Sequence, residues 1–169
     1  MPNNLTVITN PNPHLRVPAQ TGDVSYLESK EGKQFIKDLA HTMRKQDGVG
    51  LAAIQVALPR RIICIHNTAI PKELVQLLEL GRRGDLILVN PEWFPLNAKK
   101  QWDGEGCLSV PGLYGEVERH TDIQATALNQ RGKKLNFQAR DFFARVIQHE
   151  VDHLNGILFI DKARKMVNG

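Results

Sequence analysis

Apolar residues at helical spacing mark out the helices of this chain. Between Lys33 and Gln46 they recur at intervals that predict an amphipathic helix, and a leucine-rich helix is expected from Lys72 to Leu80. The segment from Asp141 to Gly156 is apolar over more than one face, with Asp141 as the expected N-cap and Gly156 at its end. A helix apolar on so many sides is predicted to lie in the middle of the fold.

Short runs rich in β-branched residues predict the strands. They occur at residues 61–65 and 85–91 and in a hairpin of residues 122–128 and 134–139, and Leu5–Ile8 predicts another short strand. Strands therefore come first along the chain and the long buried helix comes near its end. This order predicts an α+β fold of mostly antiparallel sheets packed around a central buried helix.

The composition narrows the class of protein. With 169 residues, the chain is expected to form a single domain over residues 1–169 with a sizeable core. No apolar run reaches membrane-spanning length and the first residues do not form a signal peptide, which predicts a soluble, cytoplasmic protein. The net charge of +4 is mild, so we expect no specific nucleic-acid recognition. The basic run Lys162–Lys165 is usually a solvated face, although a basic tail can also contact RNA or a ribosome.

The two cysteines stand in different surroundings. Cys64 lies in a β-branched run and is expected to be a small core residue, whereas Cys107 lies among glycines with little to bury it. A disulfide between them is not expected in a cytoplasmic chain. Cys107 is therefore free for chemistry.

The clearest chemical pattern is H-E-x-x-H, formed by His149, Glu150 and His153. Histidines four residues apart on a helix project from one face, so both can bind one metal ion, while the glutamate handles the proton of an attacking water. The alternative is a core helix with two hydrogen-bonded histidines. A third ligand would decide between these interpretations.

The stretch Gly48–Gln55 superficially matches a dinucleotide-binding fingerprint. That fingerprint requires a strand before it and a helix after it, whereas here a helix precedes and a strand follows, so a nucleotide site is rejected. The glycines instead predict a loop that lets another backbone come close, with the polar Gln55 among small apolar residues. A tight turn around a hydrogen-bonded glutamine is the other interpretation.

Three separated stretches, Gly48–Gln55, Glu105–Ser109 and Gln148–Gly156, together resemble the signature motifs of the peptide deformylases. Weaker similarity at Pro13–Arg16 and Val89–Pro91 extends the resemblance over nearly the whole chain. It implies a metal-dependent hydrolase that removes the N-formyl group from the N-terminal formyl-methionine of nascent polypeptides during protein biosynthesis, releasing formate.

The resemblance also implies roles for individual residues. The implied ligands of one divalent metal ion are Cys107, His149 and His153. The family uses iron(II) natively, with zinc, nickel or cobalt as substitutes, and a thiolate suits these metals better than magnesium. Glu150 would transfer protons, and the Gln55 amide and the Leu108 backbone N–H would hold the oxyanion.

Substrate contacts are expected on both sides of the metal. Val49, Gly50 and Gly106 would offer backbone groups to an extended peptide, which would pair like an added strand. Phe142 and Val146, on the same helix face as His149, are the candidates for the apolar methionine pocket.

Charged residues are expected to support the ligands from behind. Asp152 and Arg119 would form an ion pair that orients the Cys107 loop against the helix. Glu105 would accept a hydrogen bond from a ligand histidine, from the ring nitrogen that does not bind the metal. Only 16 residues follow His153, so we expect the C-terminal helix that some members dock on the ribosome to be short or missing.

Two other classes of protein share parts of this pattern. Zinc peptidases that cut internal bonds also use H-E-x-x-H, but their third ligand usually follows the helix, whereas Cys107 precedes it. A metal-stabilised binding module is the other alternative, and Glu150 disfavours it because a structural site is more often closed by a fourth ligand.

Overall fold

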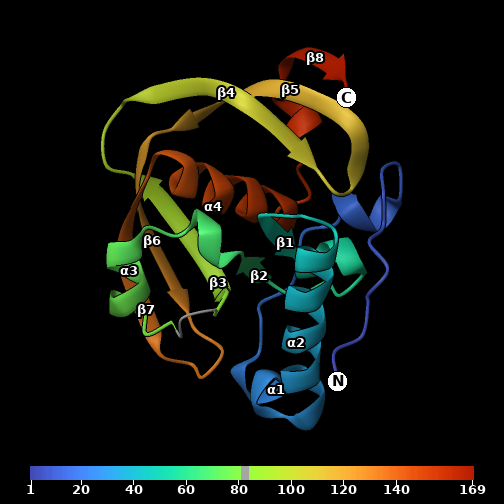
Figure 1. Ribbon diagram of the computed structural model, residues 1–169, viewed down its shortest axis with the longest axis vertical. Coiled ribbons are helices and arrows are strands. Elements are labelled where there is room, and N and C mark those ends of the chain that lie inside the picture. The colour runs from blue at the N-terminus through green and yellow to red at the C-terminus, as the bar shows by residue number, and fades with distance from the viewer. Residues whose placement is uncertain (81–83) are drawn as a thin grey trace.

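Two antiparallel sheets and the helix α4 between them dominate the computed structural model, which describes residues 1–80 and 84–169 (Figure 1). The larger sheet contains β1 (Gly50–Ala52), β2 (Ile62–Ile65), β3 (Leu86–Pro95), β6 (Asp122–Leu128) and β7 (Lys134–Arg140), paired in that order. The smaller sheet contains β4 (Lys100–Cys107), β5 (Val110–His120) and β8 (Arg164–Asn168), also in that order. All of these pairs are antiparallel, which confirms the α+β class.

Four α-helices occur in the described part of the chain. They are α1 (Val24–Glu28), α2 (Lys30–Lys45), α3 (Lys72–Leu77) and α4 (Asp141–Leu154). Short 3-10 turns lie at Pro13–Arg16, Ala53–Val56, Asn67–Ala69 and Phe159–Asp161. None of the described helices combines the length and the apolar character needed to span a membrane.

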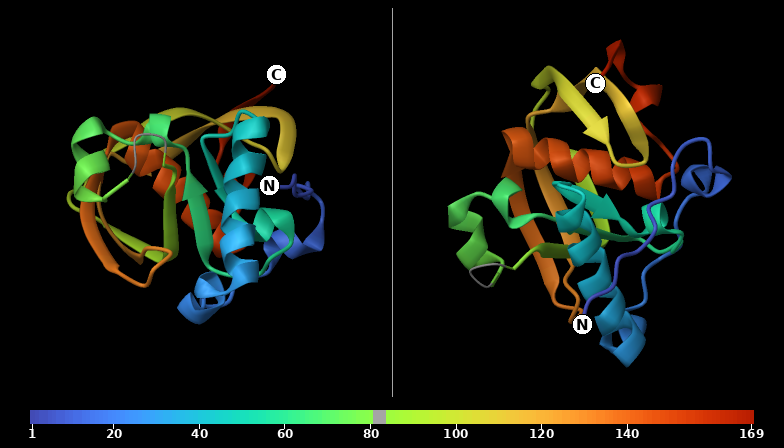
Figure 2. Two further views of the ribbon diagram at one scale, coloured as in Figure 1. Left: turned by 60° about the horizontal axis from the view of Figure 1, so that its bottom comes forward. Right: turned by 45° about the vertical axis from the view of Figure 1, so that its right-hand side comes forward.

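The larger sheet is buried on both faces at β2 and the first half of β3, whereas β7 has one exposed face. Ile63 and Ile65 of β2 belong to the core that contains the apolar residues of α4, whereas Ile62 and Cys64 belong to the core that contains those of α2. Successive side chains of a strand point to opposite faces, so the two helices cover opposite sides of this sheet (Figure 2). This explains why β2 is apolar throughout, from Ile62 to Ile65.

Helix α4 ends as its sequence predicts. Gly156 has φ +74°, a left-handed conformation that glycine adopts without strain. Its N–H donates to the His153 carbonyl at 3.1 Å, and the Ile157 N–H donates to the Asp152 carbonyl at 2.9 Å. These paired bonds satisfy carbonyls that the last helical turn leaves free, so the helix stops immediately after the second histidine.

The start of α4 differs from the prediction. Asp141 is not the N-cap but the first helical residue, with φ +48°, and Arg140 at the cap makes no side-chain capping bond. The reason is that β7 runs directly into α4 without a loop, so no residue is left to fold back over the free N–H groups. The Asp141 N–H instead donates to the Thr121 carbonyl at 2.8 Å.

Two other predictions near the N-terminus were wrong. Leu5–Ile8 joins no sheet, and the Ile8 N–H donates instead to the Gln55 carbonyl at 2.8 Å. The stretch Gly48–Gln55 is not a plain loop, since it contains β1 and begins a 3-10 turn. The group that approaches Gly50 is a side chain rather than a backbone, because a Cβ at this position would lie 2.4 Å from Glu150 Oε1.

Candidate active site

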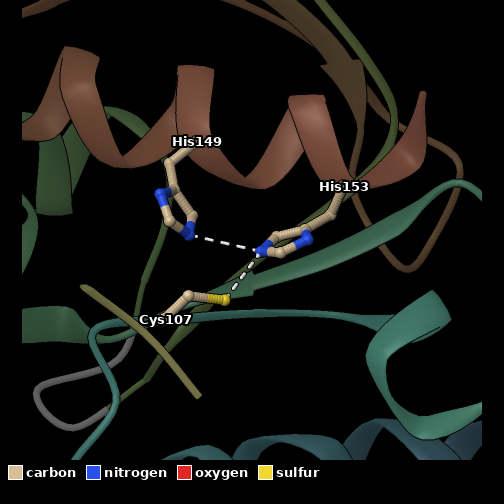
Figure 3. A group of neighbouring side chains, drawn as sticks. All are labelled: Cys107, His149 and His153. Carbon is tan, nitrogen blue, oxygen red and sulfur yellow. Dashed lines mark hydrogen bonds between the residues drawn. The ribbon is translucent and has the colours of Figure 1, made fainter. Parts of the chain in front are cut away.

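Three side chains that the sequence singles out as metal ligands meet at one point (Figure 3). His149 and His153 come from successive turns of α4, and Cys107 is the last residue of β4. The His153 Nε2 atom lies 3.3 Å from Cys107 Sγ and 3.2 Å from His149 Nε2. All three donor atoms lie within 4.8 Å of one another. One sulfur and two imidazole nitrogens form a donor set that suits zinc, iron and similar transition metals.

The surroundings of this donor set fit a metal cation. His149 Nδ1 lies 2.8 Å from Glu105 Oε2, which holds a proton on Nδ1 and leaves Nε2 facing His153 (Figure 3). One proton cannot satisfy all three atoms that meet here, His149 Nε2, His153 Nε2 and Cys107 Sγ. A metal cation placed among them could bind all three.

The electrostatics also favour positive charge at His149. Burial opposes protonation of its ring, but the neighbouring Cys107 and Glu105 outweigh burial and raise its pKa to about 10. Burial lowers the pKa of His153, which keeps that ring neutral and able to act as a ligand. This preference for positive charge beside two neutral or anionic candidate ligands is met by a proton on His149, which a bound metal ion would displace.

Glu150 is buried beside the ligands and faces the same cavity. Burial raises its pKa to about 7, although the neighbouring His149 acts in the opposite direction. Its Oε2 atom is buried and has no hydrogen-bond partner among the described residues. The carboxyl fits here because Gly50 has no side chain, since a Cβ would overlap Glu150 Oε1 at 2.4 Å.

Gln55 and Leu108 approach the ligands from two other elements. The Gln55 Oε1 atom accepts from the Ala52 N–H at 2.8 Å, which fixes the amide with its Nε2 atom 3.5 Å from Cys107 Sγ and 3.0 Å from Ser109 Oγ. Leu108 follows Cys107 in the two-residue turn that joins β4 to β5. Both residues line the cavity that contains His149 and Glu150.

The cavity lined by His149 and Glu150 has a volume of about 560 Å³. The five residues predicted to contact substrate all line it: Val49, Gly50, Gly106, Phe142 and Val146. Phe142 is half exposed, at 52%, whereas Val146 is buried at 4%. His153, Arg119 and Asp152 are not among the lining residues and lie behind the cavity wall.

A buried network of charges lies behind the ligands. Arg119 donates two bonds to Glu105, from Nε at 2.9 Å and from Nη2 at 3.0 Å, and a third to Asp152 at 2.5 Å. Asp152 also accepts from Lys162 Nζ at 3.0 Å. The network connects β4, β5 and α4, so the end of β4 is held at a fixed place against the helix.

Two buried polar residues of the site were missed by the sequence analysis. Arg145 donates from Nη1 to Glu105 Oε1 at 2.8 Å, and Ser109 Oγ accepts from Gln55 at 3.0 Å. For Arg145 a signal was present, because an arginine inside an otherwise apolar helical run needs a buried anionic partner. For Ser109 there was none, because serine is common in turns.

The N-terminal segment ties two parts of the site together. The Ile8 N–H donates to the Gln55 carbonyl and the Asn10 N–H donates to the Ser109 carbonyl, both at 2.8 Å. These two N–H groups are only two residues apart in the chain. The elements that carry Gln55 and Leu108 are therefore linked through residues 8–10.

Comparisons with known proteins agree with this geometry. The family model described as polypeptide deformylase matches residues 4–168. Peptide deformylase 1 of Clostridium acetobutylicum is 45% identical over 128 residues, covering 76% of this chain and 75% of that protein. Peptide deformylase 1 of Bacillus subtilis is 39% identical over 160 residues, covering 94% and 89%.

A solved structure of similar shape is the class I type b peptide deformylase of Acinetobacter baumannii with Met-Ala-Ser bound. It has a TM-score of 0.84 and 32% sequence identity, and the match covers 96% of this chain and 99% of that one. The family model spans nearly all of the chain, and the three ligand residues lie together as a metal enzyme requires. The chain therefore belongs to the polypeptide deformylase family and is a metal-dependent hydrolase.

Proposed function

We propose that this chain removes the N-formyl group from the N-terminal formyl-methionine of nascent polypeptides, acting as one catalytic domain over residues 1–169. The observation that supports this best is a cavity lined by Cys107, His149 and Glu150, with His153 behind its wall completing the three candidate metal-binding residues. The Acinetobacter baumannii relative carries Met-Ala-Ser, which is the peptide left when formate is removed from formyl-Met-Ala-Ser. In this scheme α4 is the central buried helix on which the site is assembled.

The proposed metal ligands are Cys107, His149 and His153. We propose one divalent ion per chain, iron(II) in the native protein, with zinc, nickel or cobalt as substitutes. When bound, the ion supplies Lewis acidity, which polarises the formyl group and makes water more acidic. The soft thiolate of Cys107 favours these metals over magnesium and calcium.

Glu150 is proposed to move the proton. Glu150 lines the cavity, its Oε2 atom has no partner among the described residues, and its carboxyl can accept a proton from the attacking water. The same carboxyl then delivers a proton to the departing nitrogen, so that formate and a free N-terminal amine are released. Because Gly50 admits the carboxyl at this position, the proton carrier and the peptide backbone lie next to each other.

Gln55 and Leu108 are proposed to stabilise the oxyanion. The Gln55 amide is held by the Ala52 N–H at 2.8 Å, so its Nε2 atom is preoriented towards the ligands. The Leu108 backbone N–H comes from the turn immediately after Cys107. Preoriented donors of this kind act on charge that develops only in the transition state.

The formyl-methionyl peptide is proposed to lie along β1. This strand is at the edge of the larger sheet, so one side of it is free among the described strands for an added strand. Val49 and Gly50 would pair with the peptide on one side of the cavity and Gly106 on the other. Phe142 and Val146 would form the apolar pocket for the methionine side chain.

The proposed partners are few. Formyl-methionyl peptides are made where translation takes place, and we propose the cytoplasm as the location of this chain. Contact with the ribosome through Lys162–Lys165 stays a prediction. Lys162 lies 2.9 Å from Asp152, and Arg164 and Lys165 lie 3.1 Å and 3.5 Å from Glu116, so this run also supports the fold.

Three peptides distinguish this activity from that of an internal peptidase. The metal-loaded protein is incubated with formyl-Met-Ala-Ser, acetyl-Met-Ala-Ser and an unformylated peptide, while formate, acetate and new peptide ends are measured. An added methyl in a close-packed pocket costs about 1–3 kcal/mol, or roughly ten- to more than a hundredfold in rate. We therefore expect rapid release of formate, slow release of acetate and no internal cleavage. Comparable release of acetate, or cuts within the unformylated peptide, would contradict the proposal.

A further inference from the structure

Arg145 is a buried cation in the site that the proposed chemistry does not use. It lies on α4 one turn before His149, is 7% exposed and lines the cavity. Its guanidinium makes three hydrogen bonds of 2.8 Å: from Nη1 to Glu105 Oε1, from Nη1 to the Val117 carbonyl and from Nη2 to the Gln101 carbonyl. A charge buried with this many bonds has a defined orientation.

The first of these bonds connects Arg145 to a metal ligand through Glu105. Glu105 Oε1 accepts from Arg145, and Glu105 Oε2 lies 2.8 Å from His149 Nδ1. Arg119 also binds this carboxylate, at 2.9 Å and 3.0 Å. Two guanidinium groups therefore fix the plane of the carboxylate, and that plane decides where Oε2 points. Figure 3 shows the two ring nitrogens of His149 on opposite sides, so holding Nδ1 sets the direction of Nε2.

The other two bonds connect Arg145 to the sheet that carries Cys107. Val117 belongs to β5 and Gln101 to β4, which ends at Cys107. Arg145 thus joins α4, the source of both histidines, to the strand that supplies the thiolate. Arg119 makes a different connection, since its remaining bond goes to Asp152 further along α4.

We propose that Arg145 is a positioning residue that orients His149 as a metal ligand, acting through Glu105 and through the carbonyls of β4 and β5. This inference rests on the proposed function, because it takes His149 to be a ligand. Arg145 does not touch the reacting atoms in this scheme. A lysine cannot replace it fully, because one ammonium cannot occupy all three places that the planar guanidinium reaches.

The test compares Arg145→Met and Arg145→Lys with the parent protein and with Arg131→Met, a matched control in the exposed turn between β6 and β7. Zinc affinity is measured by competition with a chelator, and the cobalt-loaded proteins are compared by their visible absorption spectra. Loss of a group that orients a ligand typically weakens metal binding about 10- to 100-fold. For Arg145→Met we expect zinc affinity to fall by this factor and the cobalt spectrum to change. For Arg145→Lys we expect a smaller fall in zinc affinity, and for Arg131→Met neither change.

A second background distinguishes positioning from a general effect on folding. In Glu105→Gln the path from Arg145 to His149 is weakened, so adding Arg145→Met should lower zinc affinity by much less than it does in the parent. If Arg145→Met lowered zinc affinity in the Glu105→Gln protein as much as it does in the parent, the proposal would be overturned. Parent-like zinc affinity and cobalt spectrum in a folded Arg145→Met would also overturn it. If Arg145→Met fails to fold, the test rests on Arg145→Lys. A zinc affinity of Arg145→Lys within twofold of the parent would then overturn the proposal.

The parent protein separates this inference from the proposed function. If the parent binds zinc and releases formate while the Arg145 variants behave like it, only the role of Arg145 is wrong. If the parent neither binds zinc nor releases formate, the proposed function itself fails.

Discussion

Helix α4 meets its two sheets by different physical means. Towards the larger sheet it buries Phe143, Ile147 and Leu154 in an aliphatic and aromatic core. Towards the smaller sheet it presents Arg145 and His149, which bind the buried Glu105. Apolar contacts depend on area and volume, whereas charged hydrogen bonds depend on direction. One side of the helix therefore provides stability and the other provides orientation.

This difference predicts that the two sides respond differently to substitution. Changes on the charged side should remove metal or turnover while the fold persists, because the core on the apolar side is intact. Changes on the apolar side should lower stability while the folded fraction keeps its activity. The predictions below follow the expected loss of turnover, from the largest to the smallest.

Cys107→Ala should lose both metal and turnover. Two imidazoles without the thiolate hold a transition metal weakly, so elemental analysis should find little metal after dialysis. Circular dichroism should remain that of a folded protein, because Cys107 lies outside the main core. Cys64→Ala is the matched control, since Cys64 is fully buried in β2 and is not one of the three candidate ligands, and it should keep its metal. A full complement of metal in Cys107→Ala would show that the thiol is not a ligand.

Glu150→Gln should keep about one metal ion per chain and lower turnover by at least roughly two orders of magnitude. An amide of the same shape fills the space beside Gly50 but cannot accept the proton. The measurement is formate release together with elemental analysis. Glu118→Gln, an exposed carboxyl on β5, should leave both values unchanged. Near-normal turnover in Glu150→Gln would remove this residue from the mechanism.

Loading the site with different metals should change its lifetime in air. An iron(II)-loaded sample prepared without oxygen should lose turnover on exposure, as the metal or the Cys107 thiolate oxidises, whereas a nickel-loaded sample should persist. Formate release is followed over time, with circular dichroism as the check that the apolar side stays folded. Equal lifetimes of the two samples would count against iron chemistry.

Ile147→Ala should affect stability far more than turnover. Ile147 is fully buried in the core under α4, so removing its side chain should lower the free energy of unfolding by about 2–5 kcal/mol. Urea unfolding measures this, and Ile147→Val should cost only about 0.5–1.5 kcal/mol. Turnover per folded molecule should stay within a few-fold of the parent. A hundredfold loss of turnover at unchanged stability would contradict the division between the two sides.

The sequence was informative where a pattern had a single structural meaning. The alternation in residues 122–128 and 134–139 predicted the hairpin of β6 and β7, and Gly156 predicted the end of α4. By contrast, β1, β4, β5 and β8 were missed. Most side chains of β4 and β8 are exposed, so these two strands lack the alternation that marks a half-buried strand.

The members of the candidate site were predictable, and so was part of the network behind them. The spacing of His149 and His153 indicated a shared helix face, and the structure brings Cys107 to that face. The predicted Arg119–Asp152 pair and the predicted bond between Glu105 and a histidine are both present.

Other supports could not be predicted from the sequence. That Gly50 makes room for Glu150 could not be predicted, because the contact joins residues a hundred positions apart. The sequence indicated that Arg145 needs a buried partner but not which one, because its three acceptors lie on two other strands.

The hydrogen bonds of Ile8 and Asn10 have a consequence for biosynthesis. They connect residues 8–10 with Gln55 and Ser109, and the histidines follow only at positions 149 and 153. No stretch shorter than residues 55–153 contains Gln55, Cys107, Glu150 and both histidines. Because the ribosome makes a protein from its N-terminus onwards, these groups can meet only after the stretch from Gln55 to His153 has been made and has folded back onto residues 8–10.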